Sequence, residues 1–277
     1  MTAFNNRFKD GASHFRYTIT HWTSKDLARE AMSSGIIESI SASMVRRILQ
    51  QVNLHPHRTR YWKTSRLDNN FKDRAEKVLW CYANATKLPK QGQWVICVDE
   101  IPNFQVLERN PIRRAIPGSI EQREFEYVRH GTVNLLMFLI VHSGQMKSVC
   151  LDTKSAKNYV THLEHFRRRH HRLHSVYLIH DEDPTHTAGW TQNHLGDHRD
   201  FWRSRLTPVR ASWLNQAEML NGAFSYHYLR RGSWTSRDEL MSHVASAQVE
   251  YNRLYAHPFE WTWTNQQMRR WFAEHKN

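Results

Sequence analysis

The sequence predicts an α/β protein: a mixed sheet flanked by helices, with a small all-α helix-turn-helix domain at the amino terminus. Three observations carry this prediction. Residues 21–88 show helical periodicity, short apolar runs of strand length begin near residue 94, and strand and helix patterns alternate from there on. We expect a helix-turn-helix domain over 1–64, a linking helix within 65–92 and a sheet domain over 93–277.

Composition places the chain among globular proteins. Of its 277 residues, 40% are apolar and 12% aromatic, and 8 Pro with 10 Gly are too few for a fibrous or linker-rich chain. The longest apolar run, Leu135–Val141, falls far short of the roughly 18 residues that a membrane span needs. No secretion signal is visible at the amino terminus, so we expect no membrane partner and a cytoplasmic location. The three cysteines form no CxxC pair, which argues against a zinc or redox centre.

The charge balance points to a polyanionic partner. Lys and Arg number 39 against 26 Asp and Glu, a net charge of +13. Residues 1–70 carry 11 basic and 5 acidic side chains, so positive charge is densest in the first quarter of the chain.

Two short helices are predicted in this basic quarter. Thr23 and Asp26 form a capping-box pattern before a helix that ends at Gly35. After a turn at 36–40, a second helix has one apolar face, made of Met44, Val45, Ile48, Leu49 and Val52.

The opposite face of this second helix suits a helix-turn-helix reader of double-stranded DNA. Its candidate DNA contacts are Ser43, Arg46, Arg47 and Gln50. An extended arm over 55–63 adds Arg58, Arg60 and Lys63 as candidate phosphate contacts. The alternative interpretation is an ordinary solvated pair of helices followed by a basic linker.

The second part of the chain begins with the linking helix, which ends at Pro89. The run 94–98 predicts a strand buried on both faces, and Pro102, Pro111 and Pro117 mark an irregular stretch after it. Residues 133–142 and 147–151 predict a hairpin around Ser143-Gly144.

The remaining elements alternate. We expect a helix over 156–170, a buried strand over 176–179, a further helix, a short strand near 201–206 and a long helix from Ser212. This order is typical of a mixed α/β sheet.

Acidic side chains follow two of the buried strands. Asp99 and Glu100 come directly after the first, and Asp181, Glu182 and Asp183 come directly after the strand at 176–179. If these strands are parallel neighbours, both acidic groups meet at the carboxyl edge of the sheet, where ligand sites form in α/β proteins. Crowded carboxylates favour Mg²⁺ over zinc, which prefers His or Cys.

A third acid would complete a site for two metal ions about 3.5–4 Å apart. Glu218 is the best candidate, because it borders the apolar stripe of the last predicted helix and is able to face the sheet edge. That stripe consists of Trp213, Ala217, Leu220 and Phe224. The alternative is that Glu218 is a solvated surface residue.

Four segments in order resemble the blocks of a DDE transposase, nearest to the bacterial IS six-thirty group of the mariner superfamily. They are 98–100 (VDE), 129–132 (RHGT), 178–186 (LIHDEDPTH) and 211–218 (ASWLNQAE). The last block is the most specific, and the likeness extends from about Thr20 to a block at 258–261. The 37 positions from Asp181 to Glu218 are close to the spacing of that superfamily.

The resemblance implies an RNase H-like sheet in which Asp99, Asp181 and Glu218 are the catalytic and metal-binding triad. It further implies Mg²⁺, with Mn²⁺ as a substitute, and a transposase that cleaves double-stranded DNA at transposon ends and joins them to target DNA. Assembly as a homodimer on DNA, insertion at TA and a bacterial nucleoid location are implied in the same way.

The chain departs from the family pattern in two respects. Glu182 and Asp183 follow Asp181 where Asn is common, so Asp183 stays open as an alternative second acid, although Asp181 directly follows the strand. Relatives usually begin with another helix-turn-helix, so we expect a fragment, a truncated chain or one product of a split frame. Both departures favour an alternative function, a catalytically impaired relic that binds DNA. An RNase H-fold nuclease acting on structured DNA is a further rival.

For several other basic side chains, both a functional and a purely structural interpretation stay open. His130 and His186 lie beside acidic blocks and would contact DNA, orient a carboxylate or serve only in structural hydrogen bonds. Arg123, Arg129 and the run 167–169 are either phosphate contacts or parts of solvated faces.

Overall fold

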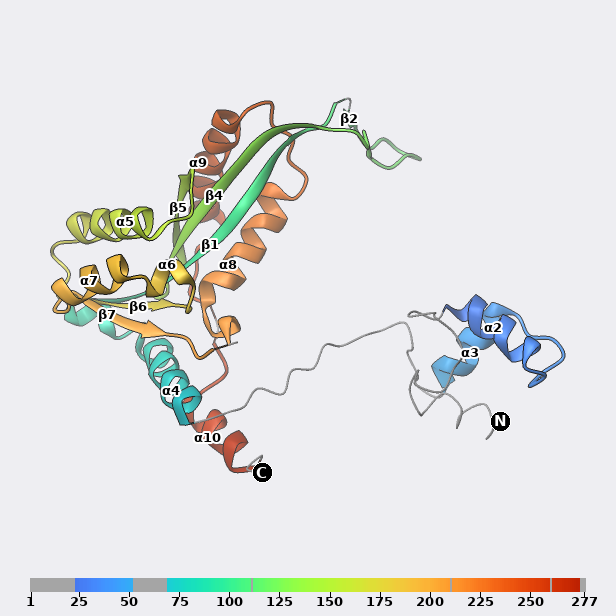
Figure 1. The fold of residues 1–277 in the computed structure, drawn as a ribbon, viewed down its shortest axis with the longest axis horizontal. Coiled ribbons are helices and arrows are strands. Elements are labelled where there is room, and N and C mark those ends of the chain that lie inside the picture. The colour runs from blue at the N-terminus through green and yellow to red at the C-terminus, as the bar shows by residue number, and fades with distance from the viewer. Residues whose placement is uncertain (1–22, 52–68, 111, 210, 260, 275–277) are drawn as a thin grey trace. The chain divides into compact units, whose positions relative to one another are not determined.

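The computed structural model describes most of the chain (Figure 1). The described residues are 23–51, 69–110, 112–209, 211–259 and 261–274. Clustering of contacts divides the chain into two compact units, 1–65 and 66–277. The functional roles expected for these two parts stay predictions.

The first unit contains the two expected helices, α2 (Ser24–Ser33) and α3 (Ala42–Gln51). Thr23 and Asp26 form the predicted capping box, in which each side chain accepts a hydrogen bond from the other's backbone N–H at 3.2 Å. Val45 and Leu49 are buried, but Met44, expected on the same face, is 42% exposed. A helix pair this small has a narrow shared face, and Met44 falls at its edge.

The second unit is built on a five-stranded mixed sheet with the order β5-β4-β1-β6-β7. Its strands are β1 (Gln93–Glu108), β4 (Val128–Ile140), β5 (Gln145–Leu151), β6 (Ser175–His180) and β7 (Trp202–Leu206). β4 is antiparallel to β1 and β5, whereas β6 is parallel to β1 and β7. β1 and β6 are therefore parallel neighbours, as the site prediction requires, but Asp99 and Glu100 lie within β1 rather than after it, because pairing with β4 extends the strand to Glu108.

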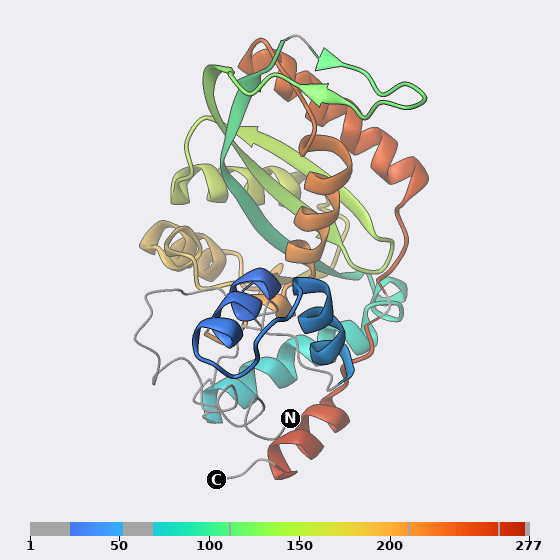
Figure 2. The same cartoon turned by 90° about the vertical axis from the view of Figure 1, so that its right-hand side faces the viewer.

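Helices cover both faces of this sheet, which confirms the RNase H-like architecture expected for this unit (Figure 2). The described helices of this unit are α4 (Asn69–Asn84), α5 (Ala156–Arg169), α6 (Pro184–Thr187), α7 (Gly189–Asp197), α8 (Gln216–Phe224), α9 (Arg237–Leu254) and α10 (Asn265–Glu274), the last of which packs against α4. Along β1, Val95 and Cys97 pack with α4, α8 and α9, whereas Ile96 and Val98 pack with α5 and α7. Alternate residues of a strand point to opposite faces, so Asp99, two residues after Cys97, lies on the same face of the sheet as Val95 and Cys97.

β1 is much longer than expected, because it continues through the stretch that Pro102 marks as irregular. The pairing with β4 shifts register between Ile101 and Phe104, and Asn103 has a φ of 50°. A bulge of this kind accommodates a proline, which has no N–H to offer the ladder. The irregular stretch shrinks to 109–127, where the short strands β2 (Ile112–Arg113) and β3 (Gln122–Arg123) pair in a hairpin that projects past the sheet in Figure 1.

The long helix expected from Ser212 is broken into three pieces. A 3₁₀ turn (Ser212–Leu214) precedes α8, and a π turn (Ser225–Leu229) follows it. The break has a local cause, because the Asn215 side chain caps α8 by accepting a hydrogen bond from the Ala217 N–H at 3.1 Å. Trp213 is consequently outside the predicted apolar stripe and half exposed.

Two further properties match the composition. All three cysteines are free thiols. In the described ranges, no helix combines the length and the hydropathy needed to cross a membrane.

Candidate active site

Asp99 lies within β1, and Asp181 directly follows β6, the parallel neighbour of β1. Cys97 of β1 pairs with Ile179 of β6, each two residues before its acid, and the charge of Asp181 acts on Asp99. Asp99 belongs to the face on which Cys97 packs, the face covered by α8. The sheet thus brings together two acids that are 82 positions apart in the sequence.

Glu218 reaches the same region from α8. The Asn215 amide donates a hydrogen bond of 2.8 Å to the Val98 carbonyl, which fastens the start of α8 to β1 one residue before Asp99. Glu218 lies in the first turn of α8 and is exposed. Its charge is among those that act on Asp99, so the structure brings the three predicted acids into one electrostatic neighbourhood.

Asp99 shows the effect of this crowding. Burial, together with repulsion by Asp181, Glu100 and Glu218, raises the pKa of the Asp99 carboxyl from 3.8 to about 7. Hydrogen bonds from the Glu100 N–H at 2.9 Å and the Asn221 amide at 3.1 Å hold the carboxylate in place. A cation bound beside Asp99 would therefore relieve a repulsion that the fold itself creates.

The donor set fits a hard divalent ion. The triad offers only oxygen atoms, and the buried Asn221 Oδ1 next to Asp99 has no hydrogen-bond partner among the described residues. The three acids do not offer oxygen atoms that all lie within 4.8 Å of one another. Among the described residues, a trio of possible metal ligands that compact occurs only in another part of the chain. Side-chain rotation would be needed for all three to bind one ion.

A buried histidine joins two of the acidic blocks. His186 of α6 has no exposed side-chain surface, and its Nδ1 lies 2.8 Å from Asp181 Oδ1 while its Nε2 lies 3.1 Å from Glu100 Oε1. Burial disfavours the imidazolium, but the hydrogen bonds with Asp181 and Glu100 outweigh it and raise the pKa of His186 to about 10. The same pairing keeps the pKa of Asp181 below its ordinary value despite burial. His186 is thus a positively charged link that orients Asp181, one of the three roles open to it from the sequence.

The two acids after Asp181 have other partners. Glu182 forms an ion pair with Arg74 of α4. Asp183 accepts hydrogen bonds from the Thr185 N–H at 2.9 Å and from Lys154 at 2.6 Å. Burial raises the pKa of Asp183, but these bonds outweigh it and lower the value to about 2. Asp183 therefore serves as the cap of α6, and its position gives no support to the alternative in which it replaces Asp181.

The remaining candidates belong to other segments of the chain. Four of the proposed DNA contacts on α3 are exposed, namely Ser43, Arg46, Arg47 and Gln50. The other three, Arg58, Arg60 and Lys63, lie outside the described residues. His130 pairs with Glu108 at 2.8 Å. Glu108 is nine residues after Asp99 on β1, which corresponds to roughly 30 Å along the strand. Arg129 donates to Gln105 at 3.1 Å in the same distal region.

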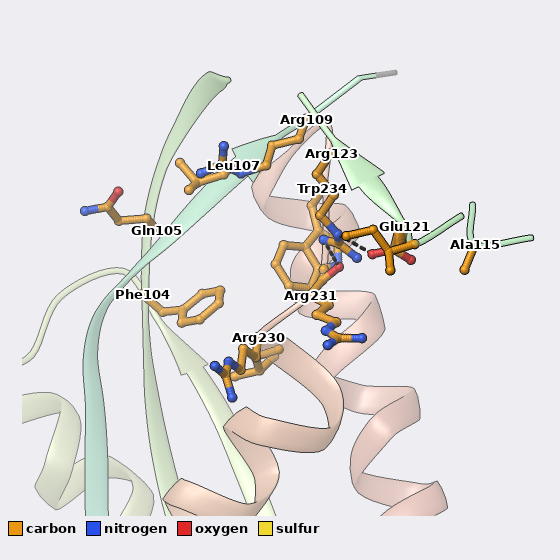
Figure 3. A pocket seen from close by; sticks show the side chains of 13 residues that line it. Phe104, Gln105, Leu107, Arg109, Ala115, Glu121, Arg123, Arg230, Arg231 and Trp234 are labelled. Carbon is orange, nitrogen blue, oxygen red and sulfur yellow. Dashed lines mark hydrogen bonds and ion pairs between the residues drawn. The ribbon is translucent and has the colours of Figure 1, made fainter. Parts of the chain in front are cut away.

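A second feature, which the sequence did not indicate, is a groove of about 910 Å³ at the distal end of β1. Figure 3 shows four arginines around it, together with two aromatic side chains: Arg109, Arg123, Arg230, Arg231, Phe104 and Trp234. Arg123 donates to Glu121 at 2.7 Å and to the Arg231 carbonyl, which ties the hairpin to the segment after α8. These arginines are up to 122 positions apart in the sequence, so no local pattern marks them as one surface.

Comparisons with known proteins support the family and the fold of this chain. The profile of a family described as DDE superfamily endonuclease matches residues 94–241, more than half of the chain. No curated protein matches it. A crystal structure of the Mos1 strand transfer complex is similar at 17% identity, with 98% of this chain and 75% of that chain covered and a TM-score of 0.59.

Two further Mos1 crystal structures show the same likeness. One is a mariner paired end complex with Mn, with 16% identity, coverage of 98% and 76%, and a TM-score of 0.56. The other is a paired-end complex with left transposon end, with 15% identity, the same coverage and a TM-score of 0.55. At these identities, the likeness concerns the fold.

Proposed function

Because this chain belongs to the DDE superfamily endonuclease family, we propose that it is a transposase that cleaves double-stranded DNA and transfers strands in the presence of Mg²⁺, or Mn²⁺ as a substitute. The observation that supports the proposal best is the electrostatic effect of both Asp181 and Glu218 on Asp99, whose strand β1 pairs in parallel with β6 just before Asp181.

The three acids share one task in this proposal. Asp99, Asp181 and Glu218 hold the metal ions, with Asn221 fixing the rotamer of Asp99 and His186 fixing that of Asp181. When bound, the ions supply Lewis acidity for in-line attack of water, and later of a 3′-hydroxyl, on a phosphodiester. The hydrogen bonds on Asp99 and Asp181 hold two of the three carboxylates before DNA arrives, which reduces the cost of organising the site.

DNA binding is proposed for both units. The exposed polar face of α3 would contact bases and phosphates, and the arginine-lined groove would bind further phosphates. Transposon ends and target DNA are the proposed partners. A homodimer assembled on two ends is proposed as well, a view supported by the paired-end complexes of the similar Mos1 structures.

A nicking assay tests the proposal. Supercoiled plasmids with and without the DNA that flanks the gene, searched first for inverted repeats, would be incubated with the full chain and Mg²⁺ or Mn²⁺. We expect cleavage near the repeats, and its loss in Asp99→Asn, Asp181→Asn and Glu218→Gln. Asp183→Asn is the matched control, because Asn also caps helices and is expected to keep most of the activity.

Two outcomes would change the assignment. Cleavage that ignores the repeats indicates a general nuclease rather than a transposase. Absence of cleavage with both metals, combined with binding of the repeats, supports the second candidate, a relic that binds DNA. The separation of the three acids and the engagement of Asp181 by His186 favour that candidate.

A further inference from the structure

A separate cluster of metal-ligating side chains joins α5 to α7, on the sheet face opposite the one that Asp99 meets. Glu164 belongs to α5, while His194 lies in the last turn of α7 and His198 is its C-cap. One ligand atom from each of the three lies within 4.8 Å of the other two, and no other His, Cys, Asp or Glu trio in the described ranges is as compact.

The distances between the three possible ligand atoms are only slightly longer than those around a small metal ion. The Nε2 atoms of His194 and His198 lie 3.9 Å and 3.8 Å from Glu164 Oε2. In a tetrahedral site with bonds of about 2.0–2.2 Å, ligand atoms are separated by roughly 3.3–3.5 Å. Closure by about half an ångström is within the reach of side-chain rotation. The two histidines are four positions apart, a spacing that places side chains on one side of a helix.

An independent observation points to a missing partner. His194 Nε2 is buried and has no hydrogen-bond partner among the described residues, and the side chain is only 11% exposed. A buried polar atom without a partner is costly. Glu164 Oε2 is the acceptor nearest to it in this cluster, and at 3.9 Å it is too distant for a hydrogen bond. An ion between these two atoms would satisfy both.

Two arginines that bind Glu164 lower the expected affinity for a metal ion, but they leave one of its oxygen atoms able to bind the ion. Arg167 donates to both carboxylate oxygens at 2.8 Å, and Arg168 donates to Oε1 at 2.7 Å. Glu164 Oε2 thus keeps one lone pair free for a further partner. The guanidinium charges oppose a cation, so the site should bind more weakly than an uncrowded zinc site.

We propose that Glu164, His194 and His198 form a binding site for a divalent transition metal of the zinc type, with water as the fourth ligand. Two imidazoles with one carboxylate favour Zn²⁺, Co²⁺ or Ni²⁺ over Mg²⁺. The ion would fasten α7 to α5. α7 in turn contacts α6, since Thr191 donates to the Thr185 carbonyl at 2.6 Å and Gln192 donates to the His186 carbonyl at 3.1 Å.

Titration of the tag-free full chain with Co²⁺ tests this site. After EDTA treatment and desalting, we expect one equivalent of Co²⁺ to produce visible absorption bands, which Zn²⁺ removes and millimolar Mg²⁺ does not. Zn²⁺ should also raise the Tm by a few degrees, because it binds the folded state alone. His198→Asn and Glu164→Gln should each weaken Co²⁺ binding at least tenfold.

The controls separate this site from its surroundings and from the proposed catalytic acids. His162 and His165 form a neighbouring pair on α5, so the double variant His162→Asn/His165→Asn should bind Co²⁺ like the original chain. Asp99→Asn should do the same. Since His198 is 34% exposed at a helix end, His198→Asn is expected to fold, and circular dichroism would verify this. Equal Co²⁺ affinity in His198→Asn and the original chain, or no binding below millimolar Co²⁺, would overturn the proposal.

Discussion

Replacement of His186 should remove a buried positive charge that holds Glu100 and Asp181 together. The pKa of His186 rises from 6.5 to about 10 in the folded chain, because its hydrogen bonds with these carboxylates outweigh its burial. At 1.36 kcal/mol per pKa unit, the rise corresponds to at most about 5 kcal/mol of stability. Loss of one partner of a buried ion pair costs about 3–5 kcal/mol, so we expect a loss in this range for His186→Asn at pH 7.

The sign of the pH dependence follows from the direction of the shift. A folded-state pKa above the unfolded value gives a contribution that is complete below pH 6.5 and disappears as the pH rises toward 10. Between pH 7 and 9.5, the folded state of the original chain binds about one more proton than the unfolded state. His186 should therefore lower the free energy of unfolding by up to about 1.4 kcal/mol per pH unit, and this contribution to the slope should be absent in His186→Asn.

Urea unfolding at several pH values, with EDTA present, measures both effects. Nine of the eleven tryptophans lie beyond residue 66, so their fluorescence reports mainly on the second unit. His174→Asn is a suitable control, because His174 is exposed and should leave stability and slope unchanged. An equal slope in His186→Asn and the original chain would refute the assignment of a protonated His186.

Three further predictions concern the fold and DNA binding. Asn215→Ala removes the cap of α8 and the partner of the Val98 carbonyl, so urea unfolding should show a loss of about 2–3 kcal/mol; a loss below 0.5 kcal/mol would contradict this anchoring role. Gly144→Ala should cost more than about 1–2 kcal/mol in the same assay, because Gly144 has a φ of 70° and a Cβ there would lie 1.8 Å from the His257 carbonyl oxygen; unchanged stability would contradict the turn geometry. Neutralising three basic residues together should lower the slope of log K against log salt by up to about 2.7 in a DNA-binding titration, and an unchanged slope would place the phosphate contacts elsewhere. These residues are Arg58, Arg60 and Lys63.

Local patterns in the sequence predicted the elements that local physics governs. The capping box at Thr23, the doubly buried strand before Asp99 and the hairpin turn at Gly144 depend on residues within a few positions of one another. The resemblance to DDE transposases added the RNase H-like fold, which the comparisons support, and the acidic triad, which stays a proposal.

Other features depended on the tertiary structure. Continuation of β1 past Pro102 required the antiparallel partner β4, because only pairing makes a bulge at Asn103 favourable over a turn. The helices α9 and α10 were not predicted as separate elements; α9 packs on the sheet face that α8 also covers, and α10 packs against α4.

The sequence by itself determined the types of most elements and the acids that follow the apolar runs 94–98 and 176–179. Only the tertiary structure decided that β1 and β6 are parallel neighbours, that His186 links Asp181 to Glu100, and that arginines from distant segments share one groove. The physical reason is the separation along the chain over which each kind of interaction acts. Capping, turn formation and amphipathic periodicity act between neighbours in the chain, whereas strand order and register join residues more than 80 positions apart through hydrogen bonds and packing that form only in the folded state.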